Sequence, residues 1–153
     1  MKVIHLTGQA PYYTNSFLLI TDKKRAIAID PAATVDQYNE LLARENATLT
    51  HIFLTHGHFD HVYSVSELQA KWNCAVYLDG ADAKGSETFP LTGETRHYTD
   101  GGQVVVDDGV FQTWHTPGHT PGSWILYCSG LLFVGDTLFQ NSVGRTDLEG
   151  GDS

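Results

Sequence analysis

Three histidines and an aspartate are packed into six consecutive residues, HGHFDH, at positions 56–61. His56 and His58 are two residues apart, so an extended backbone directs both imidazole rings to one side. Asp60 and His61 follow where the chain turns, so their side chains can point to a neighbouring metal position. Imidazole nitrogens and carboxylate oxygens are ligands that zinc prefers, at about 2.0–2.2 Å. The stretch therefore predicts a transition-metal site. A histidine-rich surface loop is the alternative.

Two further metal-competent residues follow apolar segments later in the chain. His119 lies between two Pro-Gly pairs, in TPGHTPGS, and such a stiff loop positions a ring at little entropic cost. Asp136 follows LLFVG, where we expect a carboxylate to be paired or to bind metal. Its two oxygens can bridge ions about 3.5–4 Å apart. A tight-turn histidine and a turn or N-cap aspartate are the alternatives.

Four apolar, strand-like segments end in such residues. AIAI precedes Asp30, HIFLT precedes His56, FQTWHTPG precedes His119, and LLFVG precedes Asp136. Strand ends at one edge of a sheet converge, and a rigid scaffold with variable loops is where sites form. We therefore expect the metal site at a sheet edge.

Short strands and two helices are the elements predicted to position these residues. Apolar residues recur at helical spacing in 34–46, with Thr34 as N-cap, and in 61–73. Strands are predicted at 2–6, 15–21, 26–30, 51–55, 75–78, 103–109, 111–116, 123–130 and 131–137. The last four predict an antiparallel meander, and the polar residues 79–102 predict loops. This order fits sheets covered by helices on their outer faces.

Length and composition are those of one globular domain, residues 1–153. The formal charge of −9 predicts repulsion from nucleic acid and from anionic membranes. The sequence has no signal-peptide pattern and no apolar run of membrane-spanning length. Cys74 and Cys128 lie in apolar segments, so we expect reduced, buried thiols and a cytoplasmic location.

Four stretches together resemble the metallo-β-lactamase superfamily, and within it the glyoxalase II-like hydrolases. They are THGHFDH, HTPGHTPGS, LLFVGDTLF and GRTDLEGGD, and they occur in the family's order over nearly the whole chain. The resemblance implies an α+β protein, an αββα sandwich with its metals at one edge of the two sheets.

The resemblance also implies two neighbouring metal positions. The first is held by three imidazoles, those of His56, His58 and His119. The second is held by Asp60 and His61, with Asp136 as the bridge. Asp30 matches an aspartate that supports the ligands from behind, and a turn residue at a strand end is its alternative.

The family normally continues beyond GRTDLEGGD with a helix, a strand and a further histidine that completes the second site, whereas this sequence ends at Ser153. We therefore expect a domain that is incomplete at its C-terminus, without the last helix and strand. Weak binding of a second ion and exposed apolar surface that favours a homo-oligomer follow from this expectation. Nothing resembles the glutathione-binding helical domain of glyoxalase II.

The chemistry predicted for this constellation is hydrolysis by a metal-bound hydroxide, since zinc lowers the pKa of its bound water to about 7. Asp60 is expected to orient the water as well as to bind metal. The leading substrate class is a thioester or ester of a small acid. Arg145 either contacts a substrate carboxylate or pairs with Asp147, and Phe59 and Phe139 are candidate walls of the site.

Two alternatives remain open at this point. A persulfide dioxygenase would use one iron ion, which His56, His119 and Asp136 suit. A catalytically silent domain would bind metal or a partner chain without turnover. Zinc is the expected metal, as one or two ions, with iron or manganese as its competitors.

Overall fold

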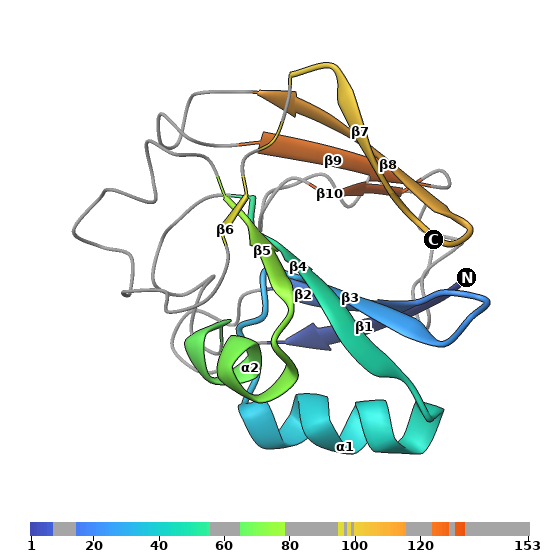
Figure 1. The fold of residues 1–153 in the computed structure, drawn as a ribbon, viewed down its shortest axis with the longest axis vertical. Coiled ribbons are helices and arrows are strands. Elements are labelled where there is room, and N and C mark those ends of the chain that lie inside the picture. The colour runs from blue at the N-terminus through green and yellow to red at the C-terminus, as the bar shows by residue number, and fades with distance from the viewer. Residues whose placement is uncertain are drawn as a thin grey trace.

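The computed structural model of the chain describes residues 1–7, 15–55, 65–78, 95–96, 98, 100–115, 124–128 and 131–133. These residues form two β-sheets packed face to face, with two helices on the outer face of the larger sheet (Figure 1). Three layers follow one another: helices, a six-stranded sheet and a four-stranded sheet.

The larger sheet has the strand order β1-β2-β3-β4-β5-β6. Its strands are β1 (Lys2–Thr7), β2 (Asn15–Ile20), β3 (Arg25–Ile29), β4 (Thr48–Phe53), β5 (Ala75–Tyr77) and β6 (Thr95–Arg96). The first three pair antiparallel, and β3 to β6 pair in parallel. Helix α1 (Val35–Glu45) connects β3 to β4, and α2 (Val65–Trp72) lies between β4 and β5, as parallel neighbours require a crossover.

Strand β6 corrects the prediction of loops throughout 79–102. Thr95 and Arg96 pair with Val76 and Tyr77 of β5. A strand of two residues is too short to show hydrophobic alternation, and it forms because the edge of β5 offers partners for its backbone.

The smaller sheet confirms the predicted antiparallel meander. Its order is β10-β9-β8-β7, made of β7 (Gly102–Val106), β8 (Gly109–His115), β9 (Trp124–Cys128) and β10 (Leu131–Phe133). From β8 on, each strand pairs antiparallel with the one that precedes it in sequence.

Helix α1 begins and ends as its sequence predicts. The Thr34 hydroxyl accepts from the Gln37 backbone N–H at 3.2 Å, and the Gln37 side chain accepts from the Thr34 N–H at 3.0 Å. This reciprocal capping box satisfies two N–H groups that the helix leaves without partners. Asn46 ends the helix in the left-handed conformation, with φ of 57°.

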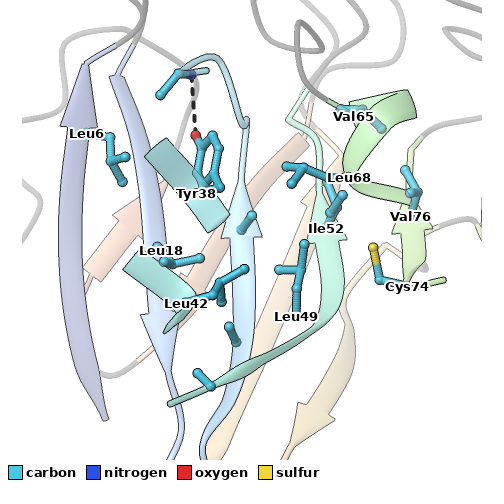
Figure 2. Packing of buried hydrophobic residues seen from close by; sticks show 14 of the residues in the cluster. Leu6, Leu18, Tyr38, Leu42, Leu49, Ile52, Val65, Leu68, Cys74 and Val76 are labelled. Carbon is cyan, nitrogen blue, oxygen red and sulfur yellow. Dashed lines mark hydrogen bonds between the residues drawn. The ribbon is translucent and has the colours of Figure 1, made fainter. Parts of the chain in front are cut away.

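The larger sheet carries an apolar cluster on each face. Leu18, Tyr38, Leu42, Leu49 and Ile52 belong to the cluster under the helices (Figure 2). The second cluster lies between the sheets and includes Ile27, Phe53, Phe111, Leu126 and Phe133. Burial on both faces explains why β3 reads as an unbroken apolar run.

Four apolar side chains of the smaller sheet are exposed: Val105 by 60%, Val110 by 43%, and Trp114 and Tyr127 by 38% each. They alternate with the buried residues of their strands, so they lie on the sheet face turned away from the larger sheet. Neither helix in the described part of the chain is long and apolar enough to cross a membrane.

Candidate metal centre

The predicted metal ligands lie outside the described residues. They are His56, His58, Asp60, His61, His119 and Asp136, and the same holds for the predicted substrate contacts Phe59, Phe139 and Arg145. Asp30 is the one predicted site residue within the described part. The structure therefore bears on the site through Asp30 and through the strands that lead into the ligands.

Contacts between two turns show which ends of the two sheets lie together. The turn before β3 meets the turn between β7 and β8: the Thr21 hydroxyl donates to Asp107 Oδ2 at 2.6 Å, and an Arg25 guanidinium N–H donates to Asp107 Oδ1 at 3.1 Å. We call this contact the turn clamp. Strands β3 and β8 both start at the turn clamp, so both run toward the opposite end of the sandwich.

The four strands that precede predicted site residues all end at that opposite end (Figure 1). Strand β3 leads to Asp30, and β4, parallel to it, ends three residues before His56. Strand β8 ends at His115, four residues before His119. Strand β10 runs in the direction of β8, because each is antiparallel to β9, and ends three residues before Asp136. These strands therefore end at the same end of the sandwich, and a metal site there stays a prediction.

Asp30 holds the backbone that leads into the histidine stretch. Its side chain is buried, and its Oδ1 accepts from the Thr55 backbone N–H at 2.8 Å. Its Oδ2 accepts from the Thr55 hydroxyl at 2.7 Å. Thr55 is the residue before His56. Asp30 also turns the chain after β3, with a left-handed φ of 49°, as the alternative of a turn residue predicts, and its support of the metal ligands stays a prediction.

A buried serine on β2 fixes the turn that carries Asp30. The Ser16 hydroxyl donates to the Asp30 carbonyl oxygen at 2.5 Å and accepts from the Ala32 N–H at 3.0 Å. Nearby, the Tyr38 hydroxyl accepts from the Ala33 N–H at 3.4 Å (Figure 2), and burial raises the pKa of Tyr38 to about 12. Ser16 is not among the residues predicted from the sequence. Its signal is a polar residue on a strand face otherwise occupied by Leu18 and Ile20.

A tyrosine in the cluster between the sheets also bonds to the residues that follow β4, which we call the exit of β4 (Leu54 and Thr55). The Tyr98 hydroxyl donates to the Leu54 carbonyl oxygen at 2.8 Å, and burial raises the pKa of Tyr98 well above its ordinary value. Leu54 and Thr55 are thus both held by buried side chains immediately before His56. Tyr98 was missed because it falls in the segment predicted as loops, where no periodicity marks it.

Two histidines of the larger sheet, His5 and His51, bond to neighbouring side chains. A ring nitrogen of His5 lies 2.7 Å from Asn15 Oδ1, in a hydrogen bond between β1 and β2. His51 Nδ1 lies 2.8 Å from the Thr50 hydroxyl, and its ring stacks on Tyr77. Burial, and then the charges of Arg96 and Arg25, lower the pKa of His51.

The donor set predicted from the sequence fits a borderline metal such as zinc or iron, because it combines four imidazoles with two carboxylates. Within the described ranges, no three His, Cys, Asp or Glu side chains gather in a way that could hold a metal ion. A metal site in the described part does not therefore compete with the predicted one.

The sequence profile of the metallo-β-lactamase superfamily matches residues 10–153. This chain belongs to the metallo-β-lactamase superfamily. It is 34% identical to a probable metallo-hydrolase, YqgX, of Bacillus subtilis, over 93% of this chain and 74% of YqgX. It is 30% identical to the hydroxyacylglutathione hydrolase GloC of Haemophilus influenzae, over 99% of this chain and 78% of GloC. The chain is thus shorter than these relatives, as expected.

Solved structures of the superfamily have the same fold. BLEG-1, a B3 metallo-β-lactamase, superposes with a TM-score of 0.79 at 32% identity, over 98% of this chain and 79% of its own. ETHE1 from Myxococcus xanthus gives 0.75 at 29% identity, over 99% and 64%. TTHA1623, in a di-iron-bound form, gives 0.72 at 31% identity, over 97% and 79%. The chain therefore belongs to a superfamily of metallo-hydrolases. Members of this superfamily bind one or two metal ions.

Proposed function

We propose that this metallo-β-lactamase superfamily chain is a zinc-dependent hydrolase that cleaves a thioester or ester of a small acid. One observation carries the proposal: the exit of β4, directly before the HGHFDH stretch, is anchored by buried Asp30 at the end of the sandwich where β8 and β10 also end. The similarity to GloC, a hydroxyacylglutathione hydrolase, supports the thioester class.

In the proposed site the imidazoles of His56, His58 and His119 hold one ion. Asp60 and His61 would hold a second, and Asp136 would be a ligand of both. A bound divalent ion supplies acidification of water and polarisation of the substrate carbonyl. The Asp60 carboxylate orients the attacking water by accepting a hydrogen bond from it.

The substrate contacts are proposed from the sequence. Arg145 binds a carboxylate of the acyl group, since its planar guanidinium matches a carboxylate in two parallel hydrogen bonds. Phe59 and Phe139 form apolar walls that exclude water from the scissile bond. The competing pairing of Arg145 with Asp147 predicts instead that Arg145→Lys leaves the KM for acidic substrates unchanged.

The test is turnover of a panel of small thioesters and esters by the zinc-loaded chain. His119→Ala should lower kcat/KM by at least about 100-fold. Removing a residue that only hydrogen-bonds to a metal ligand typically costs about 10- to 100-fold, and the loss of a ligand itself should cost more. His5→Ala is the matched control, because His5 lies on β1 and bonds Asn15, and it should leave kcat/KM unchanged. Metal binding without turnover of any substrate would favour a catalytically silent domain.

A mononuclear-iron persulfide dioxygenase is the second candidate, and the similarity to ETHE1 favours it. His56, His119 and Asp136 would hold the iron. Protein purified without added metal separates the candidates. About one equivalent of iron together with sulfur-dependent oxygen uptake would contradict the hydrolase.

We also propose a reducing, cytoplasmic location. Cys74 and Cys128 are both buried, and neither forms a disulfide. Burial raises the pKa of the Cys74 thiol to about 11, so it stays protonated and unreactive.

Self-association stays a prediction, which the exposed apolar face of the smaller sheet motivates.

A further inference from the structure

Ser16 occupies a position where packing alone would favour an apolar residue. It lies on β2, fully buried, on the face that Leu18 and Ile20 share under the helices. A buried hydroxyl is costly unless it is hydrogen-bonded. Ser16 meets this need with two bonds to one turn, donating to the Asp30 carbonyl and accepting from the Ala32 N–H. Its two partners lie on either side of Pro31.

The turn that Ser16 spans has an unfavourable backbone conformation. Asp30 has φ of 49°, in the left-handed region that a residue with a Cβ rarely adopts. Such a conformation persists where surrounding contacts over-determine it. The Asp30 backbone N–H donates to the Phe53 carbonyl at 2.9 Å, and Ser16 holds the carbonyl side of the same residue. Both sides of the Asp30 backbone are therefore held.

The orientation of the Asp30 backbone decides where its carboxylate points. From this turn the two carboxylate oxygens reach the N–H and the hydroxyl of Thr55, at 2.8 and 2.7 Å. The contacts form a continuous series from the Ser16 hydroxyl, through Asp30, to the residue before His56. No apolar contact could replace this series, since each link is directional.

We propose that Ser16 is a positioning residue for the metal-binding stretch. Its hydroxyl holds Asp30 in the left-handed turn, and Asp30 in turn holds Thr55, which fixes the point where the chain enters the metal-binding stretch. This inference rests on the proposed function. Ser16 touches neither metal nor substrate, and it acts through Asp30 and Thr55.

A purely structural role predicts something different. The loss of any buried hydroxyl with two hydrogen bonds lowers the stability of the fold. A positioning role adds weaker metal binding in protein that is still folded, because the ligands are no longer pre-organised. Metal affinity of the folded chain is therefore the decisive readout.

Thr21 offers a matched control at the other end of the sandwich. It is buried, its hydroxyl accepts from the Lys23 and Arg25 N–H groups, and it donates to Asp107 in the turn clamp. Thr21→Val thus removes a buried, multiply bonded hydroxyl from the end opposite the proposed site. It should destabilise the fold and leave the zinc dissociation constant within about twofold of wild type.

The experiment measures zinc dissociation constants by competition with a chelating dye, and the visible spectrum of the cobalt-loaded chain, for the full-length wild type and variants. Ser16→Ala should weaken zinc binding by about 10- to 100-fold and alter the cobalt spectrum, which reports ligand geometry. Ser16→Thr keeps the hydroxyl and should restore most of the affinity. Thr55→Val interrupts the series at its other end and serves if Ser16→Ala does not fold.

A Ser16→Ala and Thr55→Val pair should lose less affinity together than the sum of the two single losses, since both break one series. Wild-type zinc affinity in both single variants would overturn the inference. So would an equal loss in Thr21→Val, because that loss would reflect general destabilisation. A wild-type chain that binds no metal would overturn the proposed function and this inference with it, whereas the other two results leave the proposed function intact.

Discussion

Buried polar side chains meet at the exit of β4. Asp30 and Tyr98 approach Leu54 and Thr55 from two sides, and each satisfies groups that burial would otherwise leave without partners. Such groups cost little while bonded and much when one partner is removed. Single substitutions at the exit of β4 should therefore have large effects.

Asp30→Asn tests this at the residue scale. The amide oxygen can keep one bond, but the Thr55 hydroxyl must turn to accept from the amide N–H, and both bonds lose the carboxylate charge that strengthens them. The free energy of unfolding should fall by about 1–3 kcal/mol, measured by urea denaturation of the metal-free chain. Glu40→Gln, on the exposed face of α1, should stay within about 0.5 kcal/mol of wild type. Equal effects of the two variants would contradict the account.

His51 should make stability fall at low pH. Burial is the main cause that lowers its pKa below the ordinary 6.5, so the unfolded chain takes up this proton more readily than the folded chain. The contribution is present above about pH 6.5 and is lost as the pH falls through the folded-state pKa. Urea denaturation from pH 7.5 to 5 should show a smaller decrease for His51→Gln than for wild type. Parallel curves would show that His51 does not contribute.

At the element scale, α1 and its flanking turns return the chain from β3 to its parallel neighbour β4. Thr34 caps the helix four residues after Asp30, and Asn46 closes it before β4 begins at Thr48. The helix therefore brings the chain back to a strand parallel with β3, and Thr55 arrives beside Asp30. The caps of α1 and the hydrogen bonds between the Asp30 carboxylate and Thr55 therefore both stabilise this return of the chain.

Thr34→Ala should lower the free energy of unfolding by about 1 kcal/mol, because the Gln37 N–H loses its acceptor. Chemical denaturation followed by circular dichroism measures this loss. Gln37→Glu preserves the capping box and should stay within about 0.5 kcal/mol of wild type. A larger loss in Gln37→Glu than in Thr34→Ala would show that the box does not stabilise α1.

Periodicity and caps predicted most elements, because those signals are local. The α1 boundaries follow from Thr34 and the spacing of Tyr38 and Leu42, and the meander follows from short apolar runs between turns. Strand β6 and the roles of Ser16 and Tyr98 depend on partners distant in sequence. The residues next to a serine or tyrosine in sequence do not indicate which distant carbonyl oxygen its hydroxyl will bond. Within the site, Asp30 was found by its place after an apolar strand, whereas its contacts with Thr55 required the fold.

At the scale of the whole molecule, the sandwich has two different ends. The turn clamp joins the sheets at one end through Thr21, Arg25 and Asp107. The strands that lead toward the proposed ligands end at the other. The polar contacts of the turn clamp are thus separated from the proposed chemistry, so changes at Thr21 should alter stability without altering metal binding.

The outer face of the smaller sheet should mediate self-association. Sedimentation of the chain at tens of micromolar should show species heavier than one chain of 16.8 kDa. Val105→Lys should shift the distribution toward the monomer, since Val105 is 60% exposed in that face. The stability of the monomer should change by no more than about 0.5 kcal/mol. A wild-type chain that is monomeric at every concentration would contradict this prediction.

Elemental analysis of metal bound per folded chain tests the central claim most directly, that turns remote in sequence share one metal site at this end of the sandwich. After loading with zinc and removal of free metal, the wild type should retain one or two ions. His56→Ala/His119→Ala should lose the ion held by the three imidazoles and retain at most the weakly bound second one. His5→Ala/His51→Gln, with two histidines changed outside the predicted site, should match wild type. A folded wild type without metal, or a His56→Ala/His119→Ala variant that binds as much as wild type, would contradict the account.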